Sequence, residues 1–132
     1  MAQSETILSA ETYDGSVTTV TGEKFKGDGY YGRSDGFHTL QVDITGFIGK
    51  IQMQGTLAVD PTANDWFTIE LGTGTQTVDT TGLIVQQGID AVEYTSATTN
   101  TKSYNFTGNY VWVRTYISSW ASGTVNSIKL NH

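Results

Sequence analysis

A two-residue alternation of apolar and polar side chains restricts the fold of this chain more than any other feature. Leu40, Val42 and Ile44 are separated from one another by single polar residues. Successive side chains of a strand point to opposite faces, so the pattern predicts a strand with one buried face. Because the alternation resumes over residues 51–57, we predict a hairpin with its loop at the glycine-containing segment 46–49.

Strand character returns in the second half of the chain. The segments rich in β-branched and aromatic residues are residues 66–71, 104–106, 110–117 and 124–130. In the last segment Val125 is out of phase with Ile128, which predicts a bulge near Asn126 or Ser127.

Two regions show the alternation less clearly. Residues 72–101 are predicted to be mostly loop, with residues 83–85 as a short strand or a cover over the core. Residues 1–36 are predicted to be an N-terminal arm, with possible edge strands at 5–10 and 17–21. This arm either completes the main domain or contacts a neighbouring molecule.

Length and composition favour one all-β domain. The chain has 132 residues, of which 22 are Thr, 15 are Gly and only one is Pro. A length of this order suits a single domain, and β-branched and aromatic residues favour strands. We predict an antiparallel β-sandwich or jelly roll of about seven to nine strands over residues 37–132, with a closed barrel as the alternative.

Charge and cysteine content exclude several function classes. The formal net charge is -6, from 13 acidic and seven basic residues, and there is no cysteine. Nucleic acid and anionic membranes need clustered Lys and Arg, so we expect neither as a partner. Thiolate metal sites and cysteine nucleophiles are excluded. The first residues lack the pattern of a secretory signal, so we expect the chain to start at its own start codon and to be made in the host cytoplasm.

Catalytic motifs are absent from the sequence. His38 is in phase with the apolar residues of its strand, and His132 is the last residue. No nucleophile-elbow sequence surrounds a serine. We therefore expect no enzymatic activity, no catalytic residue and no cofactor.

One acidic turn is a weak candidate for a metal site. Asp60, Asn64 and Asp65 provide oxygen ligands within six residues of chain. The same residue types form Asx turns, in which the side chain bonds the nearby backbone. A turn that leads into Trp66 is the stronger interpretation, and we predict no metal.

Both faces of the predicted strand at residues 110–117 carry large side chains. One face carries Val111, Val113, Thr115 and Ile117, and the other carries Tyr110, Trp112, Arg114 and Tyr116. Because an arginine is rarely buried without a partner, we expect the β-branched face to be in the core. Tyr, Trp and Arg are enriched at protein interfaces. The second face is therefore predicted to be an interface or a ligand-stacking surface.

The tryptophans have a second interpretation. Trp112 fits a minor core under the N-terminal arm as well as it fits an exposed surface. Trp66 and Trp120, at strand–loop junctions, are candidates for the same interface or stacking surface and equally for core positions.

The order of these segments resembles a known family. The segments that carry the likeness are residues 39–57, 65–68, 106–114 and 122–125. They resemble the small β-sandwich virion structural proteins of tailed bacteriophages, and the ending, residues 123–132, is most similar to proteins of contractile-tailed phages of marine cyanobacteria. The resemblance covers residues 37–132 and implies a non-enzymatic component of tail or capsid.

Two functions are expected from these observations. The first is a virion structural or decoration protein, located in the virion, with other virion proteins as partners and a homo-oligomer, for example a trimer, as its assembled state. The second is a carbohydrate-binding or host-receptor module, in which exposed Trp and Tyr side chains stack on a glycan.

Overall fold

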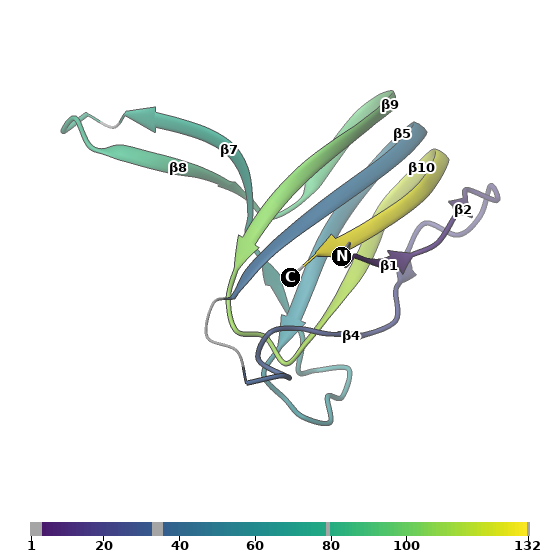
Figure 1. The fold of residues 1–132 in the computed structure, drawn as a ribbon. Helices are drawn as coiled ribbons and strands as arrows, with labels where there is room; N and C mark the ends of the chain where they lie inside the picture. The colour runs from purple at the N-terminus through teal and green to yellow at the C-terminus, as the bar shows by residue number, and fades with distance from the viewer. Residues whose placement is uncertain (1–3, 33–35, 79, 132) are drawn as a thin grey trace.

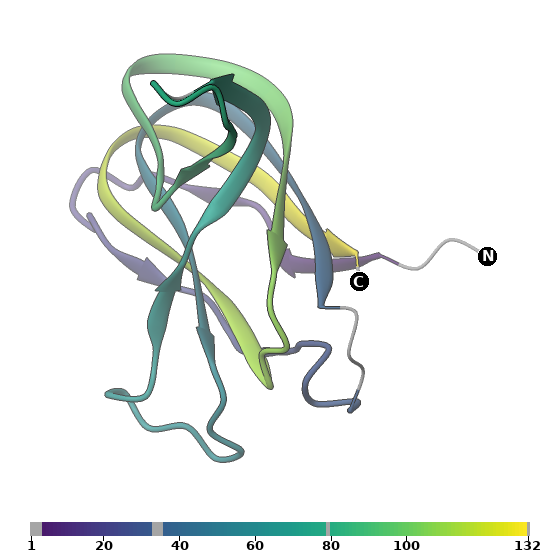
Figure 2. The same ribbon diagram turned by 90° about the vertical axis from the view of Figure 1, so that its left-hand side faces the viewer.

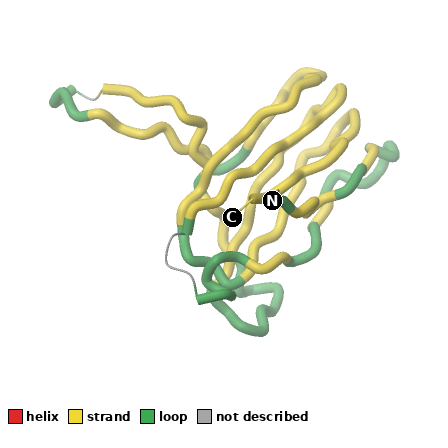
Figure 3. The backbone as a smooth tube through the Cα atoms, in the orientation of Figure 1, coloured by secondary structure: helices red, strands yellow, loops and turns green. Residues whose placement is uncertain are grey.

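A computed structural model describes residues 4–32, 36–78 and 80–131, with backbone only for residues 73–77 and 84–87. Within them there are strands and loops but no helix, so no helix is long and apolar enough to span a membrane (Figure 3). The strands are β1 (Glu5–Leu8), β2 (Glu11–Thr12), β3 (Val20–Thr21), β4 (Phe25–Lys26), β5 (Phe37–Thr56), β6 (Phe67–Ile69), β7 (Leu71–Val78), β8 (Ile84–Ile89), β9 (Val92–Thr107) and β10 (Trp112–Asn131). The predicted all-β class is confirmed.

All strand pairs are antiparallel and belong to one sheet, in the order β1-β10-β5-β9-β7-β8. The other short strands lie beside this path, since β2, β3 and β4 pair with β10 and β6 pairs with β5. β5 and β10 are paired along almost their whole length, from Trp112 opposite Thr56 to Asn131 opposite Thr39. These two strands are the centre of the sheet.

The long strands bend, and the sheet folds over itself into two layers. β5, β9 and β10 rise on one side of the molecule, arch over one end and descend on the other side (Figures 1 and 2). The β5–β10 register shifts between Ser118 and Ser122, and left-handed backbone occurs at Gly46 and Gly123, with φ of 59° and 87°. The sandwich is therefore built from two halves of the same strands, whereas a jelly roll alternates separate strands between its sheets.

The predicted hairpin at residues 46–49 is wrong, because β5 continues through this segment as one strand. Both halves of β5 pair with β10, and Phe47 between them is fully buried. Residues 112–117 and 124–130 of the other two predicted segments are likewise parts of one strand, β10. The predicted bulge is confirmed by a register shift between Val125 and Ser127.

The core lies between the two layers. Leu40, Val42 and Ile44 are at most 2% exposed, as their alternation predicts. Met53 and Val113 come from the other halves of β5 and β10 and are fully buried as well. Each such side chain contributes about 1.5–3 kcal/mol to folding through burial, so the contact between layers is the main source of stability.

The N-terminal segment runs along the outer edge of β10. β1 pairs with the last residues of β10, with Glu5 opposite Leu130, and β4 pairs with its first residues, with Phe25 opposite Val113. The segment thus completes the sheet of its own chain. Residues 28–32 of this segment form turns, while residues 33–35, like His132, lie outside the described residues.

The structure replaces the predicted loops of residues 72–101 with strands. β7 and β8 form a hairpin that projects from the body (Figure 1), and it is joined to β9 at one paired position, Gly72 opposite Asn105. The predicted strand at 104–106 is the end of the longer β9. The predicted strand at 66–71 is divided between β6 and β7, and Phe67 is 44% exposed.

Candidate functional site: an aromatic patch and a projecting hairpin

The first half of β10 has the two faces that its sequence predicts. Val113, Thr115 and Ile117 are at most 1% exposed and face the core. Trp112 and Arg114 alternate with them and are half-buried on the outer face, as is the next residue in phase, Tyr116. The outer face is therefore partly covered by other segments.

Trp112 is covered by the N-terminal segment and the β5–β6 loop. Its ring centre lies 5.1 Å from that of Tyr30, and the Lys24 ammonium lies 4.4 Å above the ring. Its indole Nε1 donates a hydrogen bond to the Val59 carbonyl at 2.9 Å. These contacts leave the indole half-buried under the N-terminal segment, which lies between the two interpretations of this residue.

Arg114 holds Trp66 against the sheet. Its Nε donates a hydrogen bond to Oε1 of Gln54 at 2.7 Å, and its guanidinium lies 4.1 Å from the centre of the Trp66 ring. Burial lowers the pKa of Arg114, while the neighbouring Tyr116 acts in the opposite direction. The side chain remains charged at neutral pH, because an arginine pKa lies far above 7.

Together these residues form a surface that we call the aromatic patch, made of Tyr30, Tyr31, Trp66, Trp112 and Arg114. Tyr30 and Tyr31 are 44% and 47% exposed and pack edge to face, with ring centres 5.5 Å apart. Lysines adjoin the patch, with the Lys26 ammonium 4.5 Å above the Tyr30 ring. The patch is thus aromatic and locally basic on a chain with a net charge of -6, a composition typical of contact surfaces.

Tyr110 does not belong to this patch, which corrects the sequence-based assignment. β10 begins two residues later, and the Tyr110 ring instead lies 5.6 Å from Phe67 and 6.1 Å from Phe106. Burial raises its pKa. His38 lies in the same cluster, stacked on Phe106 at 4.4 Å, with Nδ1 2.9 Å from the Gly36 carbonyl. Its contacts are those of a core residue.

Trp120 is a core residue, so its assignment to an interface or stacking surface is wrong. It is 2% exposed, its ring lies 6.0 Å from Tyr13 and 6.1 Å from Phe47, and its Nε1 donates to the Ser122 carbonyl at 2.9 Å. The reason is the bend in β10, where Ser119 has a φ of 51° and turns the next side chain inward. No ring face of Trp120 is open to a ligand.

The acidic segment before Trp66 is a turn. The Asp65 carboxylate accepts hydrogen bonds from the backbone N–H and the hydroxyl of Thr62 at 2.6 and 3.1 Å. In the described part of the chain, no group of three His, Cys, Asp or Glu residues could hold a metal ion. The turn interpretation is therefore the one with structural support.

The β7–β8 hairpin, which we call the hairpin arm, was not predicted from the sequence. Val78 and Leu83, near its tip, are 67% and 66% exposed. The available signal was the alternation of Thr73, Thr75 and Thr77 before Val78. It was hidden because the alternating residues of β7 are threonines and not large apolar residues, and burial of one apolar face is what makes a strand pattern visible.

The fold of this chain is similar to that of a solved structure. The crystal structure of the SPBc2 prophage-derived protein YomS is similar to this chain, with a TM-score of 0.51 and 16% sequence identity over 97% of this chain and 88% of that one. No protein-family model and no curated protein sequence matches. At this identity the likeness shows a shared fold.

Proposed function

We propose that the chain is a phage structural protein, of tail or capsid, that assembles with copies of itself through the hairpin arm and the aromatic patch. The observation that carries this proposal is the hairpin arm. It leaves the body after one paired position with β9 and presents exposed Val78 and Leu83 near its tip. Exposed apolar side chains on a projecting element are typical of a contact made with another molecule.

The comparisons and the sequence support the same proposal. A solved structure that shares this fold over nearly the whole chain is that of a prophage-derived protein, and the segment order resembles virion proteins of tailed phages. Next to the aromatic patch, Leu57 and Val59 are 64% and 70% exposed, so a second apolar surface lies at the loop end of the sandwich. A subunit with two such surfaces has what it needs to bind neighbours in a particle, and we place the protein in the virion with a non-enzymatic role.

Analytical ultracentrifugation of the full chain tests the proposal. We expect the wild-type chain to sediment as an oligomer, and Val78→Asp combined with Leu83→Asp to shift it to a monomer without lowering its unfolding temperature. Val17→Asp is the matched control, since Val17 is also exposed, at 46%, but lies outside the arm and the patch. A wild-type monomer at every concentration, or an oligomer unaffected by the double variant, would contradict the proposal.

Glycan or host-receptor binding at the aromatic patch is the second candidate. The observation in its favour is the exposed pair Tyr30 and Tyr31 beside Lys26. Against it, one face of Trp112 lies under Lys24 and one face of Trp66 lies under Arg114. A glycan array separates the candidates, because binding that is lost in Tyr31→Ala but retained in the arm variant would favour a receptor-binding role.

A further inference from the structure

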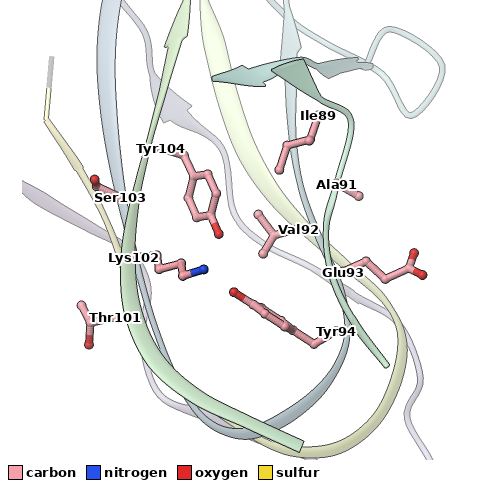
Figure 4. A pocket seen from close by; sticks show the side chains of 9 residues that line it. All are labelled: Ile89, Ala91, Val92, Glu93, Tyr94, Thr101, Lys102, Ser103 and Tyr104. Carbon is pink, nitrogen blue, oxygen red and sulfur yellow. The ribbon is translucent and has the colours of Figure 1, made fainter. Parts of the chain in front are cut away.

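A hollow of about 690 Å³ lies on the concave side of the bent strand β9. The two arms of β9 form its walls, and the end of β8 closes one side (Figure 4). Its volume is within the range of about 300–1,000 Å³ that is usual for small-molecule sites. The aromatic patch and the tip of the hairpin arm take no part in it.

The inward phase of β9 carries one charged residue. Val92 and Tyr104 are 3% and 6% exposed, and Tyr94 is half-buried. Lys102 is in the same phase and points into the hollow with these side chains (Figure 4), although it is exposed. A lysine at a position where its neighbours in phase are apolar or aromatic places one positive charge in a hollow lined by both polar and apolar side chains.

No described carboxylate neutralises this charge. Glu93, the acidic residue of the hollow, points away from it (Figure 4) and pairs with Lys50 at 3.3 Å. Among the residues that the structure describes, none forms an ion pair with Lys102. Attraction of an anion is therefore not offset by a built-in partner.

Two phenol hydroxyls point to the same place as the Lys102 ammonium (Figure 4). The amide of Asn100 donates to the hydroxyl of Tyr94 at 3.3 Å, which orients it. Burial, together with the nearby Tyr94, raises the pKa of Tyr104. Its hydroxyl therefore keeps its proton at neutral pH and can take part in hydrogen bonds to an oxygen ligand.

We propose that the hollow binds a carboxylate carried on a small ring, with the carboxylate at Lys102 and the Tyr94 hydroxyl and the ring against Val92 and Ile89. An ammonium and a hydroxyl together recognise a carboxylate by charge-assisted hydrogen bonds. Contact with the side chains of Val92 and Ile89 then favours a carboxylate that carries a ring over a small carboxylate ion. Two classes of compound carry a carboxylate on a small ring, namely acidic sugars and apolar ring acids. The site is independent of assembly, so it stands or falls separately from the proposed function.

Titration of the isotope-labelled full chain, followed by the backbone amide signals of residues 89–104, tests this site. The probes are glucuronate, benzoate, methyl glucoside and acetate at constant ionic strength. We expect saturable shifts with glucuronate or benzoate, and the better of the two identifies the source. Methyl glucoside, which lacks the charge, and acetate, which lacks the ring, should bind at least about tenfold more weakly.

Variants sharpen the same experiment. Lys102→Gln should weaken the better probe about tenfold and Tyr94→Phe about threefold. Lys129→Gln, an exposed lysine on β10, should leave it unchanged. An inward-pointing lysine on a strand near the sheet edge also prevents edge-to-edge association. The proposal is wrong if the wild-type chain shows no saturable shift with either ring acid, or if acetate binds as well as both. Aggregation of Lys102→Gln would then assign Lys102 to protection of the sheet edge.

Discussion

The body of the sandwich and the hairpin arm are both antiparallel β-structure, but they are held in place differently. In the body, β5 has paired strands on both sides and carries side chains such as Leu40 and Phe47 that are fully buried. In the arm, β7 and β8 pair with each other, and Val78 is 67% exposed. The contrast shows that backbone pairing is enough to form a strand, whereas the burial of its side chains determines how much the strand contributes to stability.

The largest effect on stability is expected from a substitution in the body, and almost none from a substitution in the arm. Phe47→Ala removes a fully buried ring that packs on Trp120 at the bend, and we expect a loss of about 3–5 kcal/mol in the free energy of unfolding. Val78→Ala, in the arm, should change it by less than about 0.5 kcal/mol. Urea unfolding of both variants measures the difference, and equal effects would mean that the arm is packed as tightly as the body.

A smaller loss is expected where the body bends. Gly123 has a φ of 87°, and a Cβ there would overlap the backbone of Gly46 and Phe47. Gly123→Ala should cost more than about 2 kcal/mol, because left-handed backbone strain adds to the overlap. Gly15, with a φ of 94° and open space around it, is the matched control, and Gly15→Ala should cost only about 1 kcal/mol. Equal losses would show that the close approach at the bend does not matter.

The aromatic patch should lie between body and arm in stability. Arg114→Met keeps part of the packing but removes the bond to Gln54 and the charge over Trp66. We expect a loss of about 1 kcal/mol, with a change in tryptophan fluorescence because Trp66 loses its neighbour. Thermal unfolding followed by fluorescence measures both, and an unchanged emission spectrum would mean that the ring is held by other contacts.

The smallest effect concerns a local turn far from either region. The backbone N–H groups of Val17 and Ser16 lower the pKa of Asp14 below 3.8. The stability that this carboxylate contributes is complete above its unfolded pKa and is lost as the pH falls through its folded pKa. A titration of the Asp14 side chain by nuclear magnetic resonance should show the lowered pKa, and Asp14→Asn should remove this part of the acid sensitivity. A midpoint at or above 3.8 would contradict the hydrogen-bond geometry.

The body could be predicted from the sequence because its strands alternate across a buried face. The bends could not, since a glycine in a bend has the same sequence signal as a glycine in a hairpin loop. Gly46 differs from a hairpin-loop residue only in that the halves of β5 before and after it both pair with the same strand, β10. Such pairing joins residues far apart in the chain, and local patterns do not record it.

The candidate site shows the same limit. Trp112 and Trp120 are eight residues apart in one strand, yet the first is on the outer face and the second is in the core. Their difference comes from the shift in phase at Ser119, which no local signal marks. The inward position of Lys102 was missed as well, because residues 72–101 were predicted to be mostly loop and the predicted strand began only at Tyr104.

The pairing of β1 with the end of β10 has a consequence for how the chain reaches its native state. Glu5 lies opposite Leu130, so the first strand finds its partner only after the last residues have been synthesised. β5 also waits for β10, which it pairs with from end to end. Contacts this distant in sequence make folding slow. Until they form, the alternating strands are exposed, which makes the partly folded chain prone to aggregation.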